Sequence, residues 1–203
     1  MNLRTRPACR LLFIACVVPL IYLAVRFAVG ALAGNPVRTA ILYTGDWTMR
    51  LLILSLAVRP LSDLCRLKTL LPFRRPLGLG ALFYAALHFA LYLGLEYFFR
   101  LSVLLQDARR TPYILVGIGN LLILILLGVT STRGLKRRLG PKRWGSIHRL
   151  VYPVAVGGVV HYTLKAKTAS PELLAYAALV AILLVYRLMR KPLGLSARGP
   201  ASP

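Results

Sequence analysis

Acidic residues are almost absent from this chain. Only 5 of its 203 residues are Asp or Glu, against 27 Lys and Arg, so the net charge is +22. Five carboxylates are too few to help coat a soluble surface, and 58% of the residues are hydrophobic, more than soluble domains usually contain. The apolar residues gather in blocks of about the length that a bilayer demands. This composition predicts an integral membrane protein.

Several motifs are also missing. There is no G-x-G-x-x-G after a strand, no P-loop and no G-x-S-x-G. The three cysteines form neither a C-x-x-C pair nor a covalent heme attachment motif. The basic charge comes without a nucleic-acid recognition motif, so we expect no nucleic-acid partner. The chain is therefore expected to lack a dinucleotide site of its own.

Six apolar blocks are each long enough to cross a bilayer as a helix. They cover residues 11–31, 42–61, 77–98, 112–130, 147–164 and 173–188. Lys and Arg gather in the N-terminal tail, the second and fourth loops and the C-terminal tail, so the positive-inside rule places both termini in the cytoplasm. The first block also resembles a signal peptide, but its apolar run exceeds the usual core of about 7–15 residues.

Histidine is scarcer still, with His88, His148 and His161 as the only three. Polar groups in hydrocarbon tend to mark function, and imidazole is a standard axial ligand of heme iron. Counted from the cytoplasmic ends of their helices, His88 lies about 16 Å and His161 about 21 Å along the axis. These similar depths predict that both clamp one heme in the outer half of the bilayer. The alternative, histidines that only hydrogen-bond to neighbouring helices, stays open.

His148 belongs to a different layer, about 20 Å from His161 and close to the cytoplasm. Thirteen residues at about 100° each leave the two residues some 140° apart around an ideal helix. Pro153 and the Gly157-Gly158 pair lie between them and can re-phase the helix. If they do, both histidines face one interior and can serve two stacked hemes. If they do not, His148 acts from the rim.

Four arginines are candidates for binding the anionic groups of a cofactor. Arg50 lies inside the second block, where it either snorkels to the interface or pairs with a heme propionate. Arg74, Arg75 and Arg149, on the cytoplasmic side, are candidates for propionates of an inner heme or for the phosphate of a flavin. Topogenic charge explains these three equally well.

Several motifs between about residues 40 and 165 occur together in one order. They are Thr44 to Arg50 with Pro60-Leu61; Arg74-Arg75, Leu77-Gly78-Leu79 and Tyr84 to His88 with Tyr92; Thr130-Ser131, Arg138-Leu139-Gly140 and Trp144; and His148 to Tyr152 with His161-Tyr162. Together they resemble the MsrQ family, formerly YedZ, the heme-binding membrane subunits of the bacterial methionine sulfoxide reductase system.

The resemblance implies a ferric-reductase-like transmembrane domain in the bacterial inner membrane, with b-type heme and also FMN. His88, His148 and His161 match the heme-associated histidines of the family, while no residue here is assigned to FMN. Electrons would come from a cytoplasmic flavin reductase or from quinol. They would pass through heme to MsrP, the periplasmic molybdopterin-containing catalytic subunit that reduces methionine sulfoxide in oxidised proteins.

We therefore expect an all-α integral membrane protein with six transmembrane helices in one bundle. Residues 1–10 are expected to form a cytoplasmic tail, 11–190 the heme-binding domain and 191–203 a flexible cytoplasmic tail. The expected function is electron transfer, without reduction of the final substrate by the chain itself. Two alternatives stay open: a stand-alone heme reductase of ferric ion or quinone, and a non-redox membrane transporter or scaffold.

Overall fold

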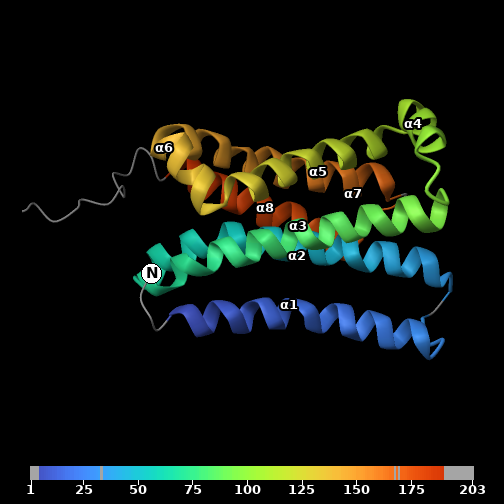
Figure 1. The fold of residues 1–203 in the computed structure, drawn as a ribbon, viewed down its shortest axis with the longest axis horizontal. Coiled ribbons are helices and arrows are strands. Elements are labelled where there is room, and N and C mark those ends of the chain that lie inside the picture. The colour runs from blue at the N-terminus through green and yellow to red at the C-terminus, as the bar shows by residue number, and fades with distance from the viewer. Residues whose placement is uncertain (1–4, 33, 167, 169, 190–203) are drawn as a thin grey trace, which may run out of the picture.

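The described part of the chain is helical, with its long helices lying side by side along one axis (Figure 1). The computed structural model describes residues 5–32, 34–166, 168 and 170–189. The long helices are α1 (Thr5–Ala28), α2 (Pro36–Leu64), α3 (Arg74–Leu91), α5 (Pro112–Thr130), α7 (Val151–Lys165) and α8 (Pro171–Met189). Helix α1 begins inside the segment expected to be a tail, and the expected tail 191–203 lies outside the described residues.

Among the described residues, five segments are long and apolar enough to cross a membrane, by length and composition. They are Leu11–Ala28, Pro36–Leu64, Lys68–Glu96, Pro112–Thr130 and Pro171–Met189. These confirm a helical membrane bundle and five of the six predicted spans. The block at 147–164 forms a 3₁₀ turn, η3 (His148–Leu150), and then the 15-residue α7, which packs against α5 and α8. Helix α7 alone covers only about 22 Å of a hydrocarbon core of about 30 Å.

Three long helices start in the same way, with a short polar residue followed by proline. Their starts are Asn35-Pro36 for α2, Thr111-Pro112 for α5 and Ser170-Pro171 for α8. The Asn35 side chain accepts a hydrogen bond from the Arg38 N–H at 3.1 Å, and Ser170 Oγ accepts one from the Leu173 N–H at 3.2 Å. Proline suits the first helical position because its missing N–H has no partner to lose there. All three starts lie at the end of the bundle predicted to be outer.

The bundle is built from two helix pairs, α2 with α3 and α5 with α7. Leu52 of α2, Tyr84 of α3 and Val154 of α7 are among the largest fully buried side chains. Helix α8 packs against both pairs, and α1 lies at one edge of the bundle against α3 (Figure 1). Many apolar side chains of α1 and α8 point outward and are exposed, as expected for helices that face lipid tails.

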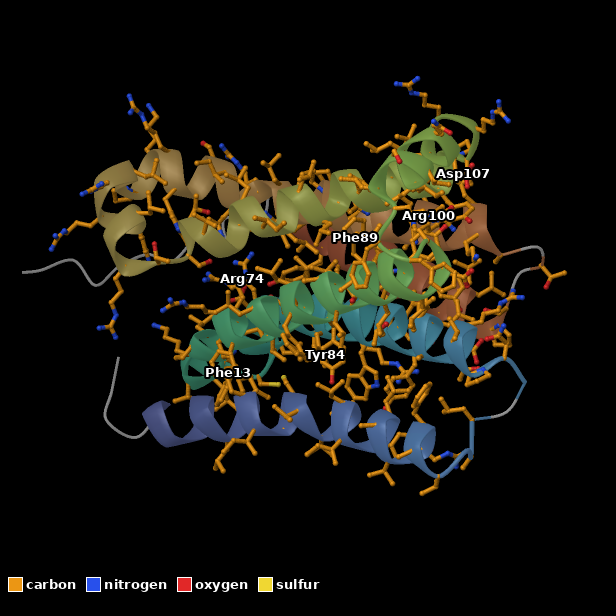
Figure 2. The ribbon with its side chains drawn as sticks, turned by 45° about the vertical axis from the view of Figure 1, so that its right-hand side comes forward. Phe13, Arg74, Tyr84, Phe89, Arg100 and Asp107 are labelled. Atoms are coloured by element: carbon orange, nitrogen blue, oxygen red, sulfur yellow. The ribbon has the colours of Figure 1, made fainter. Side chains whose placement is uncertain are left out.

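Short elements that we did not predict cover the two ends of the bundle. They are the 3₁₀ segment η1 (Lys68–Phe73), the π-helical turn η2 (Tyr92–Glu96), α4 (Leu101–Arg110) and α6 (Arg133–Ile147). Figure 2 shows Arg74 at one end of α3, and Arg100 and Asp107 at the opposite end of the molecule. Helix α6 is kinked at Gly140, whose φ of 69° lies in the left-handed region that glycine adopts without strain.

One buried hydrogen bond ties α1 to the rest of the bundle. The Tyr84 hydroxyl donates to the Cys16 carbonyl of α1 at 2.7 Å, and the Tyr84 ring stacks on Trp47 of α2 with ring centres 6.1 Å apart. Tyr84 has no exposed surface. Its hydroxyl therefore depends on this carbonyl for a partner.

We expect Tyr84→Phe to lower the free energy of unfolding by about 0.5–1.5 kcal/mol, because it removes this hydrogen bond and leaves the carbonyl without it. Thermal unfolding of the purified protein in detergent measures the change. Tyr22→Phe is the matched control, since Tyr22 is 53% exposed on α1. Equal stability of the two variants would contradict the importance of the α1–α3 contact.

Candidate functional site

A cavity of about 930 Å³ lies between α2, α3, α5 and α7. This volume falls in the range of about 300–1,000 Å³ typical of cofactor and ligand pockets. Its lining includes His88 from α3 and His161 from α7. The prediction that these two residues meet at one depth is confirmed: their ring centres are 6.2 Å apart.

Each of the two imidazoles is held by a backbone carbonyl of the neighbouring helix. His88 Nδ1 lies 2.8 Å from the Ile41 carbonyl oxygen of α2, and His161 Nδ1 lies 2.7 Å from the Tyr113 carbonyl oxygen of α5. A carbonyl oxygen can only accept, so each Nδ1 carries the proton and each Nε2 keeps its lone pair. Both rings are thus fixed in the tautomer that can bind a metal through Nε2.

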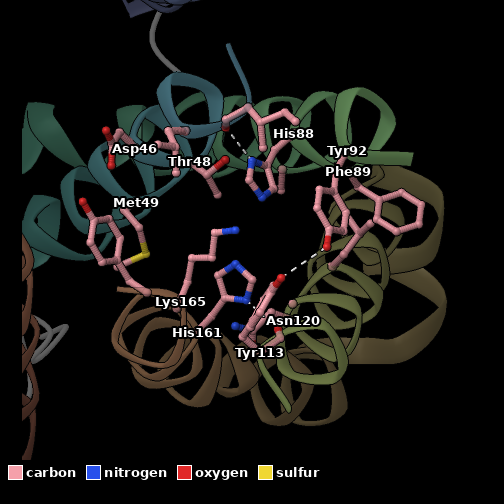
Figure 3. A pocket seen from close by; sticks show the side chains of 18 of the residues that line it. Asp46, Thr48, Met49, His88, Phe89, Tyr92, Tyr113, Asn120, His161 and Lys165 are labelled. Carbon is pink, nitrogen blue, oxygen red and sulfur yellow. Dashed lines mark hydrogen bonds between the residues drawn. The ribbon is translucent and has the colours of Figure 1, made fainter. Parts of the chain in front are cut away.

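The spacing of the rings fits one metal ion between them. Two metal–nitrogen bonds of about 2 Å, with about 1.2 Å from each nitrogen to its ring centre, place opposed ring centres about 6.4 Å apart. The observed separation is 6.2 Å, and the ring planes are turned by 85°. Figure 3 shows the Nε2 atoms facing each other across the cavity. The residues present therefore fit the bis-imidazole ligation of a heme iron.

Glycines let the neighbouring helices approach both rings. A Cβ on Gly45 of α2 would lie 3.1 Å from His88 Nδ1, and a Cβ on Gly117 of α5 would lie 2.9 Å from His161 Cε1. Both distances are shorter than ordinary van der Waals contact. Any side chain at these positions has to push the ring away from its carbonyl, so glycine keeps the two imidazoles in place.

Other residues of the lining were not predicted from the sequence. Asn120 of α5 lines the cavity beside His161, and within the described residues its side chain has no hydrogen-bond partner. An amide within the apolar run 112–130 is costly in hydrocarbon, so the sequence offered a reason to consider Asn120 as a functional residue. Tyr113 and Lys165 gave no comparable signal, because both stand where a helix meets the membrane surface and where such residues are common.

A smaller vestibule of about 410 Å³ adjoins the outer end of the cavity. Tyr92 Oη lies 3.4 Å from the hydroxyl oxygens of both Tyr97 and Tyr113, and Tyr97 donates to Asp107 at 3.1 Å. Burial raises the pKa of the Tyr97 phenol, so it stays a neutral donor to the Asp107 carboxylate. The chain of hydroxyls connects the surroundings of His161 with the surface helix α4.

His148 lies in a separate layer, as predicted, and does not line the cavity. Its Nε2 is 3.2 Å from Thr130 Oγ1 of α5, and its ring stacks on Trp144 with centres 4.1 Å apart. Helix α7 is continuous through Pro153 and the glycine pair, so the break in phase comes earlier, in η3. His148 and His161 nevertheless both contact α5.

With His88 and His161 facing each other, the chain offers no further histidine as a second ligand for a heme at His148. The ligand role of His148 stays a prediction. Its surroundings are cationic, with the Lys136 amine 4.5 Å from the centre of the Trp144 ring on which His148 stacks.

The four candidate arginines lie away from the cavity. Arg50 donates from Nε to the Tyr176 hydroxyl of α8 at 3.1 Å and lies 5.3 Å from the ring centre of Trp47. Arg74 and Arg75 begin α3 at the inner end, and Arg149 donates to Ser146 Oγ at 2.8 Å. None of the four belongs to the cavity lining. Their binding of propionate or phosphate stays a prediction.

Comparison with known proteins agrees with this geometry. Residues 44–159 match the family model "Ferric reductase like transmembrane component". A Rhodospirillum rubrum protein named "Protein-methionine-sulfoxide reductase heme-binding subunit MsrQ" is 44% identical, over 87% of this chain and 85% of its own length. Proteins of the same name from Herminiimonas arsenicoxydans and Brucella ovis are each 41% identical, over 87% and 89% of this chain and 82% and 81% of their own lengths.

We expect Gly117→Ala to weaken heme retention by about five- to a hundredfold, because overpacking against the His161 ring costs about 1–3 kcal/mol. The heme content of the purified protein and its transfer to apomyoglobin measure retention. Gly119→Ala is the matched control two residues along α5, since a Cβ on Gly119 meets nothing within 4 Å. Equal retention in both variants would show that the close approach of α5 is unimportant.

Proposed function

The chain belongs to the MsrQ family of heme-binding membrane subunits, within the ferric reductase like transmembrane components, and from this premise we propose that it carries electrons across the bacterial inner membrane to a protein-methionine-sulfoxide reductase. The observation that carries the proposal is the pair of opposed Nε2 atoms of His88 and His161, in a cavity of cofactor size.

Bound heme supplies one-electron chemistry at its iron. The chain's own residues bind and position the cofactor. His88 and His161 would hold the iron, and the Ile41 and Tyr113 carbonyls fix the tautomers of both imidazoles and raise their basicity. The apolar part of the lining excludes water, which keeps the site in a low dielectric and favours electron transfer over side reactions.

The proposed acceptor is the periplasmic molybdopterin-containing catalytic subunit that reduces methionine sulfoxide in oxidised proteins. The position of the cavity supports this direction, because its mouth and the tyrosine vestibule both open at the end predicted to be periplasmic. The proposed donor is a cytoplasmic flavin reductase or quinol, at the opposite end. FMN enters only through the family resemblance, and no described residue is assigned to it.

We expect His88→Ala and His161→Ala each to lower bound heme by more than about tenfold, because each removes an axial ligand rather than an outer contact. The reduced-minus-oxidised spectrum of the purified protein measures the loss. His148→Ala is the control, and it should keep the heme held by the other two residues. Spectra like wild type in either ligand variant would refute the pairing.

The same variants test the function in cells. Reduction of periplasmic methionine sulfoxide should stop in His88→Ala cells and continue in cells with the intact chain. A colourless wild-type protein from heme-replete cells would refute the redox role altogether. Bound heme without any effect on methionine sulfoxide would favour a stand-alone reductase.

The proposed topology has six spans with both termini in the cytoplasm. Helix α7 is the fifth span in chain order, lengthened by η3 and shielded from lipid along much of its side by α5 and α8. We expect alkaline phosphatase to be active when fused in the loop near residue 168 and inactive when fused near residue 140, since only an exported reporter matures. Activity at both positions would mean that α7 does not cross the membrane.

A further inference from the structure

The cavity changes character along its length. The inner end is lined by apolar side chains, namely Leu52, Leu121, Leu124 and Val154. The outer mouth is lined by polar and charged ones, namely Asn35, Arg38, Glu96, Lys165 and Ser170.

A flat ligand with carboxylates along one edge has a single favourable orientation in this cavity, because a carboxylate at the inner end would be desolvated without a partner.

Two cations of the mouth take equivalent places relative to the two histidines. Lys165 follows His161 by four residues on α7, so it lies on the same face one turn outward. Arg38 precedes Ile41, the residue whose carbonyl holds His88, by three residues on α2. The two helices run in opposite directions, so Lys165 lies about 6 Å outward of His161 and Arg38 about 4.5 Å outward of Ile41 along the helix axes.

Neither cation is neutralised by a carboxylate of the described residues. The one salt bridge found among them joins Arg59 and Asp63, at the inner end of α2. The Lys165 amine instead lies 5.1 Å from the ring centre of Tyr113, and Figure 3 shows it reaching into the cavity beside His161.

Two carboxylates belong to the same lining, Asp46 and Glu96. The Asp46 carboxylate points away from both imidazoles (Figure 3). Glu96 also borders the vestibule and stands eight residues beyond His88 on the chain. Lys165 therefore presents positive charge to the cavity beside His161, and Arg38 lines the same outer mouth.

We propose that Lys165 and Arg38 form the subsite for the two propionates of the heme, which fixes the heme with its carboxylate edge toward the outer mouth. This inference rests on the proposed function. Arginine offers a bidentate fork for one carboxylate, and lysine offers a mobile point charge for the other. The assignment differs from the sequence prediction, which placed propionates at Arg50 or at the inner arginines.

The test compares hemin with hemin dimethyl ester, in which both carboxylates are capped. The full chain is produced under heme limitation, purified in detergent and titrated with each compound. Wild type should bind hemin about tenfold or more tightly than the ester, because a hydrogen bond to a charged group contributes about 1.5–3 kcal/mol. The double variant Lys165→Gln/Arg38→Gln should bind the two compounds equally, and Lys165→Arg should keep the preference.

Arg109→Gln/Arg110→Gln is the matched control, since it removes the same charge from exposed positions of α4. It should keep the preference for hemin. A preference that survives in Lys165→Gln/Arg38→Gln, or that is lost equally in the control, would overturn the subsite. Failure of the proposed function looks different: wild type would then bind neither compound, or His88→Ala would bind both as well as wild type does.

A second readout is the midpoint potential of the bound heme. Lys165→Gln should lower the equilibrium constant for heme reduction by about threefold or more, because a nearby cation favours the more negative reduced state. Glu96→Gln should shift it in the opposite direction. An unchanged potential in Lys165→Gln would overturn the placement of its charge beside the heme.

Discussion

Two hydrogen bonds from imidazole Nδ1 to backbone carbonyl determine what the cavity can bind. The carbonyls of Ile41 and Tyr113 accept from His88 and His161, and so they decide which nitrogen of each ring keeps its lone pair. Without them the rings can rotate or change tautomer, and the opposed Nε2 atoms lose their alignment. A helical carbonyl has a second lone pair, so it can serve the imidazole while it remains in the helix ladder.

The packing of the bundle divides the site into two halves, one for each histidine and its carbonyl. Helices α2 and α3 supply one carbonyl and its histidine, and α5 and α7 supply the other. These are also the two pairs that pack most extensively along one another. Each pair is a complete half of the site, with Gly45 or Gly117 allowing the close contact between helix and ring. Bringing two preformed halves together is then sufficient to align both ligands.

Much of this was visible in the sequence, for physical reasons. Bilayer thickness gives helices a known length, so the similar depths of His88 and His161 follow from residue counting alone, and the structure places their ring centres 6.2 Å apart. The surroundings of His148 could not be derived, because the 3₁₀ turn η3 changes the helical phase next to that residue. Tyr113 acts through its backbone, which side-chain patterns do not reveal. The roles of Arg38 and Lys165 depend on which helices become neighbours, while charge patterns show only that both lie near a membrane surface.

The cavity also bears on the stability of the chain. Within the described residues, neither Nε2 atom nor the Asn120 amide has a hydrogen-bond partner. A ligand that coordinates the imidazoles and fits the cavity of about 930 Å³ would gain dispersion contacts along the apolar part of its lining. A ligand that satisfies the imidazoles and fills the space adds its binding free energy to that of the folded bundle. The residues that form the site for an iron porphyrin therefore also determine how strongly its binding stabilises the folded bundle.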